Sequence, residues 1–169
     1  AFNEKDLLKA HGMMMRALIE DAGCYRRGGV GVFGDQGLVH LAPPADRVPT
    51  LMNELFVWLK NSKDHLLIRS CVFHYEFEFI HPFADGNGRM GRLWQSLILQ
   101  KWRPFFAWLP IETLIHENQD GYYGALNVSN VGGESTAFVT FMLRIIRDAL
   151  DEIIESQYAN RDDNRHVGT

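Results

Sequence analysis

Apolar residues recur at helical spacing along most of the chain. In residues 4–21 they fall on one face of a helix, and the same periodicity is present in residues 46–59, 93–102, 113–128 and 137–154. The pattern therefore predicts a chain that is mainly helical.

Two segments depart from this periodicity. Residues 25–41 combine glycines with alternating valines, which predicts a β-hairpin whose turn lies at residues 34–37. Residues 66–80 fit both an alternating strand and a helical face, and the length of 15 residues favours the helix. The expected fold is an all-α bundle carrying one β-hairpin.

Composition limits the classes of function. The 169 residues fit one domain, assigned to residues 1–156, with a polar and frayed tail at residues 157–169. With 17 Lys and Arg against 21 Asp and Glu, the net charge of -4 gives no general reason to bind nucleic acid or an anionic membrane. Any phosphate must therefore be held by local groups.

The sequence predicts a cytoplasmic protein, because it shows neither a membrane span nor a signal peptide and its cysteines are expected to be reduced. No apolar run approaches the roughly 20 residues that span a bilayer, and the first residues do not have the zones of a signal peptide. Cys24 and Cys71 each lie among apolar neighbours, so both are expected to be buried, reduced thiols. Because the chain begins at Ala1 rather than Met, a processed product or a piece of a longer protein is expected.

One loop concentrates polar chemistry between two apolar helices. Residues 86–88 contain two glycines at the start of a helix, where free N–H groups and the helix dipole favour an anion such as phosphate. Arg89 and Arg92 share a helical face that could neutralise phosphate oxygens, and Asp85 could hold a Mg²⁺ ion that bridges them. His81 stands just before this cradle and has the intrinsic pKa of a general base.

The loop sequence HPFADGNGRMGR resembles the Fic family signature HxFx[D/E]GNGRxxR, and it matches every specified position. The resemblance extends to the hairpin, to the approach HYEFEFIHPF and to the pair Tyr122 and Tyr123. It implies a helical core with a β-hairpin flap, and it implies protein adenylylation with ATP and Mg²⁺ as the usual activity.

The resemblance also implies roles for individual residues. His81 would deprotonate a Ser, Thr or Tyr hydroxyl of a target protein, Phe83 would anchor the loop, and Asp85 would bind Mg²⁺ on the phosphates of ATP. The other positions that it assigns to ATP are Gly86, Asn87, Gly88, Arg89, Gly91, Arg92, Tyr122, Tyr123 and Asn130. The flap positions that would align the target are Val32, Phe33, Gly34 and Asp35.

Regulation and partners are expected from the same resemblance. Many members carry an inhibitory helix of pattern [S/T]xxxE[G/N], whose glutamate pairs with the second motif arginine, here Arg92. Residues 113–118 match this pattern with Glu117, but they correspond to the ordinary helix before the tyrosine pair. The inhibitory helix is therefore expected outside this chain, N-terminal to it or on a separate antitoxin. The long amphipathic helices leave a homodimer open.

Other functions remain as alternatives. The glycines also fit G-x-G-x-x-G, so a strand at residues 66–80 could feed a dinucleotide site with Glu112 as the ribose acid. The fold could instead serve as a binding module without catalysis. Transfer of UMP, phosphocholine or phosphate, and removal of AMP, are also compatible with the family.

The remaining histidines, tryptophans and paired arginines are assigned ordinary structural roles. The histidines show no metal-ligand spacing and are expected at the surface or satisfied in the core, the tryptophans are expected in the core, and Arg26–Arg27 is expected to be a solvated pair. These residues are His11, His40, His65, His74, His116 and His166, and Trp58, Trp94, Trp102 and Trp108.

Overall fold

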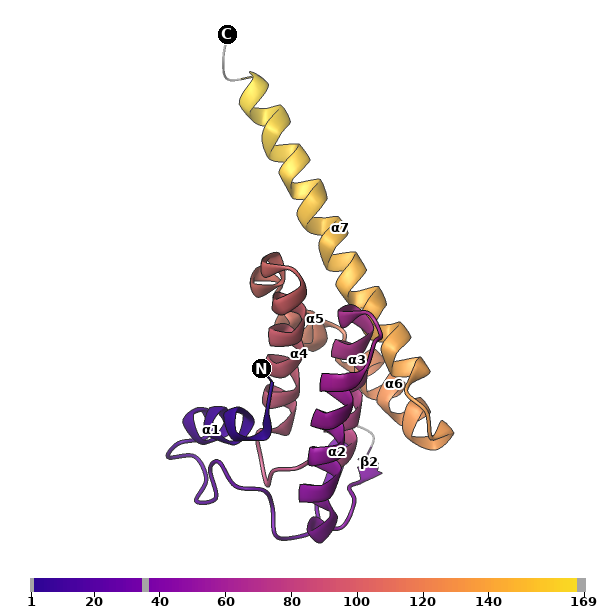
Figure 1. Cartoon of the computed structure of the whole chain (residues 1–169). Coiled ribbons are helices and arrows are strands. Elements are labelled where there is room, and N and C mark those ends of the chain that lie inside the picture. The colour runs from indigo at the N-terminus through magenta and orange to yellow at the C-terminus, as the bar shows by residue number, and fades with distance from the viewer. Residues whose placement is uncertain (1, 35–36, 167–169) are drawn as a thin grey trace.

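A computed structural model describes residues 2–34 and 37–166, and these form a mainly helical fold with one antiparallel hairpin (Figure 1). The elements in chain order are α1 (Glu4–Met14), β1 (Gly31–Gly34), β2 (Gly37–Leu41), η1 (Ala45–Arg47), α2 (Val48–Asn61), α3 (Leu66–Ile80), α4 (Asn87–Trp102), η2 (Pro104–Trp108), α5 (Ile111–Glu117), α6 (Gln119–Gly132) and α7 (Thr136–His166). The prediction of a mainly helical chain is confirmed.

Helix α3 lies at the centre of the molecule and packs along α4. Its apolar residues point to two cores: Phe73 and Phe77 pack with α1 and α2, while Cys71 and Tyr75 pack with α5, α6 and α7. A helix that is apolar on all sides must be buried on all sides. This explains why residues 66–80 fit a strand and a helix equally well by pattern.

Several helix boundaries differ from the predicted ones. Helix α1 ends at Met14 because the chain turns back, so that the Gly23 N–H bonds to the His11 ring. The helix expected over residues 113–128 is broken at Asn118, whose amide donates to the Leu114 carbonyl and competes with helix continuation.

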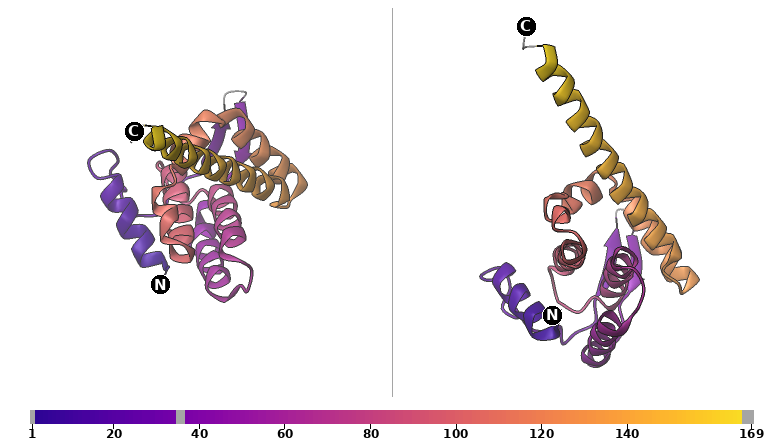
Figure 2. Two further views of the ribbon diagram at one scale, coloured as in Figure 1. Left: turned by 90° about the horizontal axis from the view of Figure 1, so that it is seen from above. Right: turned by 45° about the horizontal axis from the view of Figure 1, so that its top comes forward.

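The C-terminal tail also differs from the prediction. Helix α7 continues to His166, so the tail expected to be frayed is helical over most of its length. The preceding turns of α7 already form a helix, and each residue added to an existing helix gains one backbone hydrogen bond. Figure 2 shows this end of α7 extending beyond the rest of the bundle. The domain boundary at residue 156 stays a prediction.

Three expectations about burial were wrong. Trp108 is 84% exposed, because it lies in the short η2 turn rather than on a packed helix face. Cys24 is exposed, although Cys71 is buried as expected. Arg26 is only 4% exposed and is not a solvated side chain.

The hairpin is short and irregular. Strands β1 and β2 pair antiparallel, Val32 with His40 and Phe33 with Leu38, with a register shift between these pairs. Strand β2 lies beside α6. Asp35, one of the predicted flap positions, lies outside the described residues.

Among the helices that the structure describes, none combines the length and the apolar character needed to cross a bilayer.

Candidate active site

His81 caps the C-terminus of α3 in a strained conformation. Its φ of 49° lies in the left-handed region, and its N–H donates to the Phe77 carbonyl at 2.9 Å. This conformation costs a residue other than glycine about 1–2 kcal/mol. Strain of this kind is concentrated at functional sites, and the side chain is still 18% exposed. The imidazole is therefore both held in place and reachable.

Arg26 holds the turn that carries His81. Its guanidinium donates to the carbonyls of His81 at 2.7 Å and Ile80 at 3.2 Å, which are among the last carbonyls of α3 and have no partner within the helix. It also donates to the carbonyls of Gly28 and Pro43, on either side of the hairpin. One buried arginine thus connects the candidate base to both ends of the hairpin.

His11 supports the motif loop from α1. Because Nδ1 accepts the Gly23 N–H, the ring proton lies on Nε2, which donates to the Asp85 carbonyl at 2.9 Å. Burial lowers the pKa of His11, so the ring stays neutral. It also stacks on Phe83 with centroids 3.6 Å apart. His11 is a satisfied core histidine, as expected, and it fixes the loop.

The start of α4 is a candidate anion site. The buried Asn87 amide bonds to both backbone groups of Phe83, at 2.8 and 2.9 Å, and so closes the loop. Gly86 has a φ of 83° and is the N-cap without a side-chain cap bond. The first N–H groups of α4 therefore have no acceptor within the helix, and the dipole adds positive charge. The Asn87 side chain braces the loop that presents these groups.

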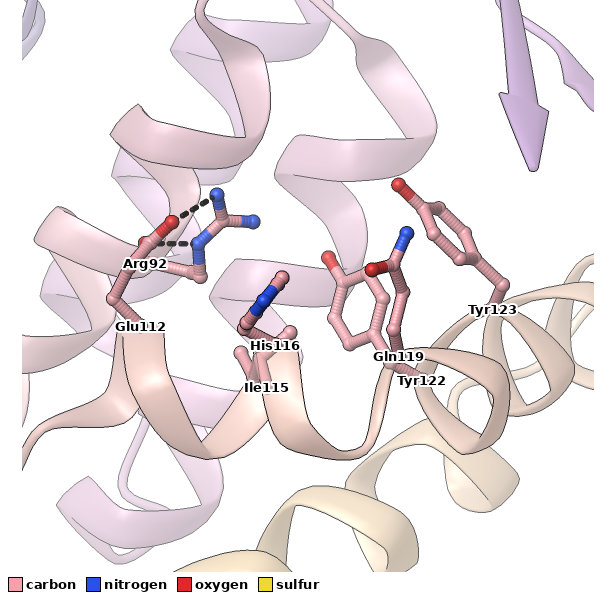
Figure 3. Close-up of a pocket in the computed structure, with 7 residues that line it drawn as sticks. All are labelled: Arg92, Glu112, Ile115, His116, Gln119, Tyr122 and Tyr123. Carbon is pink, nitrogen blue, oxygen red and sulfur yellow. Dashed lines mark hydrogen bonds and ion pairs between the residues drawn. The ribbon is translucent and has the colours of Figure 1, made fainter. Parts of the chain in front are cut away.

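Two arginines extend this positive region. Arg89 is exposed, with Nη2 3.5 Å from the Asp85 carboxylate. Arg92 donates through both Nε and Nη2 to the carboxylate of Glu112 on α5 (Figure 3). A Cβ at Gly88 would lie 2.8 Å from Arg92 Nη1, so the guanidinium covers the first turn of α4.

A pocket opens beside Arg92. Its lining comes from α4, α5 and α6, and Arg92 and Tyr123 lie toward opposite ends (Figure 3). The lining residues are Arg92, Glu112, Ile115, His116, Gln119, Tyr122 and Tyr123. Both tyrosines predicted to contact the nucleotide thus line one pocket, whereas the third predicted residue, Asn130, accepts a hydrogen bond from Tyr75 on α3.

Some predicted site residues lie elsewhere. Gly91 packs against α3, where a Cβ would come within 2.8 Å of Glu78 Oε1, so this glycine allows two helices to approach. Glu117 is exposed, and within the described part of the chain Arg92 pairs with Glu112 instead. The dinucleotide alternative is wrong, because residues 66–80 form a helix rather than a strand.

Sequence reasoning missed three residues that shape the site. Arg26 and His11 lie far from the motif in sequence, and Arg26 stands beside a second arginine, so neither residue carries a sequence signal of its role. Glu112 stands directly before residues 113–118, which match the inhibitory pattern, but Glu112 itself is not one of the positions that this pattern specifies. Their roles follow from distant backbone contacts that spacing does not reveal.

The residues present fit a Mg²⁺ ion held mainly by phosphates. Among the described residues, no group of three or more His, Cys, Asp and Glu side chains could hold a metal alone. Mg²⁺ is commonly bound by one or two carboxylates together with substrate phosphates. Asp85 is 63% exposed at the mouth of the anion site and suits that arrangement.

Comparisons with known proteins agree with this geometry. Residues 1–99 match the Fic/DOC family. A crystal structure of a Fic family protein from Desulfovibrio desulfuricans G20 has a TM-score of 0.89 at 55% identity, over 92% of this chain and 48% of that one. Fic-1 from C. elegans shares the fold, with a TM-score of 0.72 at 23% identity, over 94% of this chain and 45% of that one.

Two curated relatives are named as adenylyltransferases. "Protein adenylyltransferase Fic" from Aedes aegypti is 32% identical over 152 residues, which cover 87% of this chain and 28% of that protein. A "probable protein adenylyltransferase" from Aquifex aeolicus is 41% identical over 76 residues, which cover 44% of this chain and 23% of that protein. The chain spans about a quarter of the length of these relatives.

Proposed function

The chain belongs to the Fic/DOC family, and we propose that it is a protein adenylyltransferase that transfers AMP from ATP to a Ser, Thr or Tyr hydroxyl of another protein. The observation that carries this proposal is the position of His81 immediately before the anion site at the start of α4. A base and a phosphate cradle on one rigid loop are what transfer of a phosphate-linked group requires.

The reaction assigns one role to each part of the site. The target oxygen attacks the α-phosphorus of ATP, the bond to the β-phosphate bridging oxygen breaks, and pyrophosphate leaves. His81 takes the hydroxyl proton, and the N–H groups of α4 with Arg89 and Arg92 balance the phosphate charge. Mg²⁺ at Asp85 would neutralise further charge on the phosphates. The hairpin would receive an extended target segment by strand addition.

Labelling in a cell lysate tests this function. The purified chain is incubated with Mg²⁺ and either α-³²P-ATP or γ-³²P-ATP, beside His81→Ala. Label on protein from the α-phosphate alone, and only with His81 present, is the expected result. Label from the γ-phosphate would mean kinase activity, and labelling that does not need His81 would contradict the mechanism.

Asp85→Ala is expected to reduce AMP transfer strongly and to flatten its dependence on Mg²⁺ concentration. The variant removes the carboxylate assigned to the ion, whereas the loop keeps its backbone bonds to His11 and Asn87. The measurement is a Mg²⁺ titration of initial rates. A titration curve with an unchanged midpoint would contradict the assigned metal role.

Glu112→Gln is expected to tighten ATP binding by roughly twofold to fivefold, which corresponds to the contribution of a good exposed ion pair, up to about 1 kcal/mol. Glu112 accepts from two donors of Arg92, so the outer phosphates of ATP must compete with this carboxylate for the same guanidinium. Isothermal titration calorimetry with ATP and Mg²⁺ measures the change. Glu117→Gln on the same helix is the matched control, and equal affinities for both variants would refute the competition.

A further inference from the structure

Glu78 is a buried carboxyl group for which the reaction above has no role. It lies in the last turn of α3, three residues before His81, and it is only 6% exposed. Its Oε2 is 3.8 Å from His81 Nδ1, and its Oε1 has no hydrogen-bond partner. A buried carboxylate without sufficient compensation is costly, so a specific use of its charge is expected.

The other neighbouring histidine does not compensate this charge. His74 lies 3.8 Å from Glu78 Oε1. Its Nδ1 donates to the Gln95 carbonyl oxygen at 2.6 Å, so Nε2 carries a lone pair and accepts from the Tyr122 hydroxyl at 3.1 Å. Burial lowers the pKa of His74 to about 3, which keeps the ring neutral. The pair His74 and Glu78 is therefore not an ion pair.

Arg92 and Tyr122 complete the polar surroundings of Glu78, from α4 and α6. Burial raises the pKa of Glu78 to about 7, and the positive charge of Arg92 opposes that rise. Arg92 already bonds to Glu112 through two of its donors. A positive charge on His81, whose Nδ1 lies 3.8 Å from Glu78 Oε2, would thus be a new partner for the Glu78 carboxylate.

We propose that Glu78 is a positioning residue for His81, whose carboxylate orients the imidazole through Nδ1 and stabilises the imidazolium formed when Nε2 takes the hydroxyl proton. The inference rests on the proposed function, since it assigns a partner to the same base. The proton taken from the hydroxyl stays on His81 and does not pass to Glu78. Glu78 supplies a negative charge and fixes the orientation of the imidazole. The bond-making atoms are untouched by Glu78, so it acts through His81.

The sign of the pH effect follows from this arrangement. An opposite charge within about 4–6 Å favours the protonated imidazole, so the carboxylate raises the pKa of His81. Without it the pKa of His81 falls, and activity, which needs the neutral ring, persists to lower pH. The maximal rate falls at the same time, because the base is weaker and less well oriented.

Glu78→Gln in the full chain is expected to lower kcat for AMP transfer by about 10- to 100-fold, with KM for ATP changed less than about twofold. The acidic limb of the pH profile is expected to move to lower pH. Glu76→Gln is the matched control, since Glu76 lines a separate pocket on the opposite side of α3. A lower rate with an unmoved pH profile would assign Glu78 a merely structural role and overturn the inference.

A second measurement does not require activity. Nuclear magnetic resonance titration of labelled histidine rings, with His81 assigned by His81→Ala, gives the pKa of His81 directly. Glu78→Gln is expected to lower it by about 1, and Glu78→Asp to lower it less. An unchanged pKa would overturn the inference even if the protein transfers AMP. A lowered pKa in a protein that labels no target would sustain it while the proposed function fails.

Discussion

Replacing His81 with alanine is expected to reduce the rate of AMP transfer by about 10²- to 10⁴-fold, the usual contribution of a general base. The affinity for ATP is expected to stay nearly unchanged, because the groups that we propose to bind phosphate belong to α4 and not to His81. Single-turnover rates with α-³²P-ATP, together with calorimetric binding of ATP, separate the two effects. Normal transfer by this variant would refute the assignment of the base.

The matched control for this variant lies on the same helix. His65 caps the N-terminus of α3, whereas His81 caps its C-terminus, so the two are separated by about 24 Å at 1.5 Å per residue. His65→Ala removes a capping side chain and is expected to cost about 1 kcal/mol of stability without changing the rate of transfer. Equal losses of activity in both variants would indicate an effect on α3 rather than on the chemistry.

The sequence could predict the motif loop well because its chemistry is local. His81, Asp85 and the first turn of α4 lie within one short segment, and their spacing places a histidine before a helix N-terminus. The mainly helical fold class could also be predicted from the sequence, because the helical spacing of apolar residues extends over long segments. Even α3, ambiguous by pattern, could be assigned from its length.

The groups that hold this loop could not be predicted in the same way. Arg26 and His11 reach backbone carbonyls that lie 55 and 74 residues away, and backbone acceptors have no signature in a sequence. The pairing of Arg92 with Glu112 rather than Glu117 depends on which turn of α5 packs beside α4. These arrangements follow from tertiary packing.

Arg26 therefore provides the largest expected effect on stability. Arg26→Ala removes all side-chain donors from four backbone carbonyls, those of Gly28, Pro43, Ile80 and His81. Each buried acceptor left without a donor costs about 1–3 kcal/mol, and water can reach some of them, so we expect a loss of about 3–5 kcal/mol. Urea unfolding followed by tryptophan fluorescence and circular dichroism measures this loss.

The neighbouring arginine is the control for this prediction. Arg27 is exposed, and Arg27→Ala is expected to change the free energy of unfolding by less than about 0.5 kcal/mol. Arg26→Lys is expected to recover little, since a single ammonium cannot follow the fork geometry that reaches separate carbonyls. Superimposable unfolding curves for the Arg26 and Arg27 variants would show that water satisfies these carbonyls. A large difference in the free energy of unfolding would mean that the segments flanking the hairpin and the turn that carries His81 are stabilised by the same side chain.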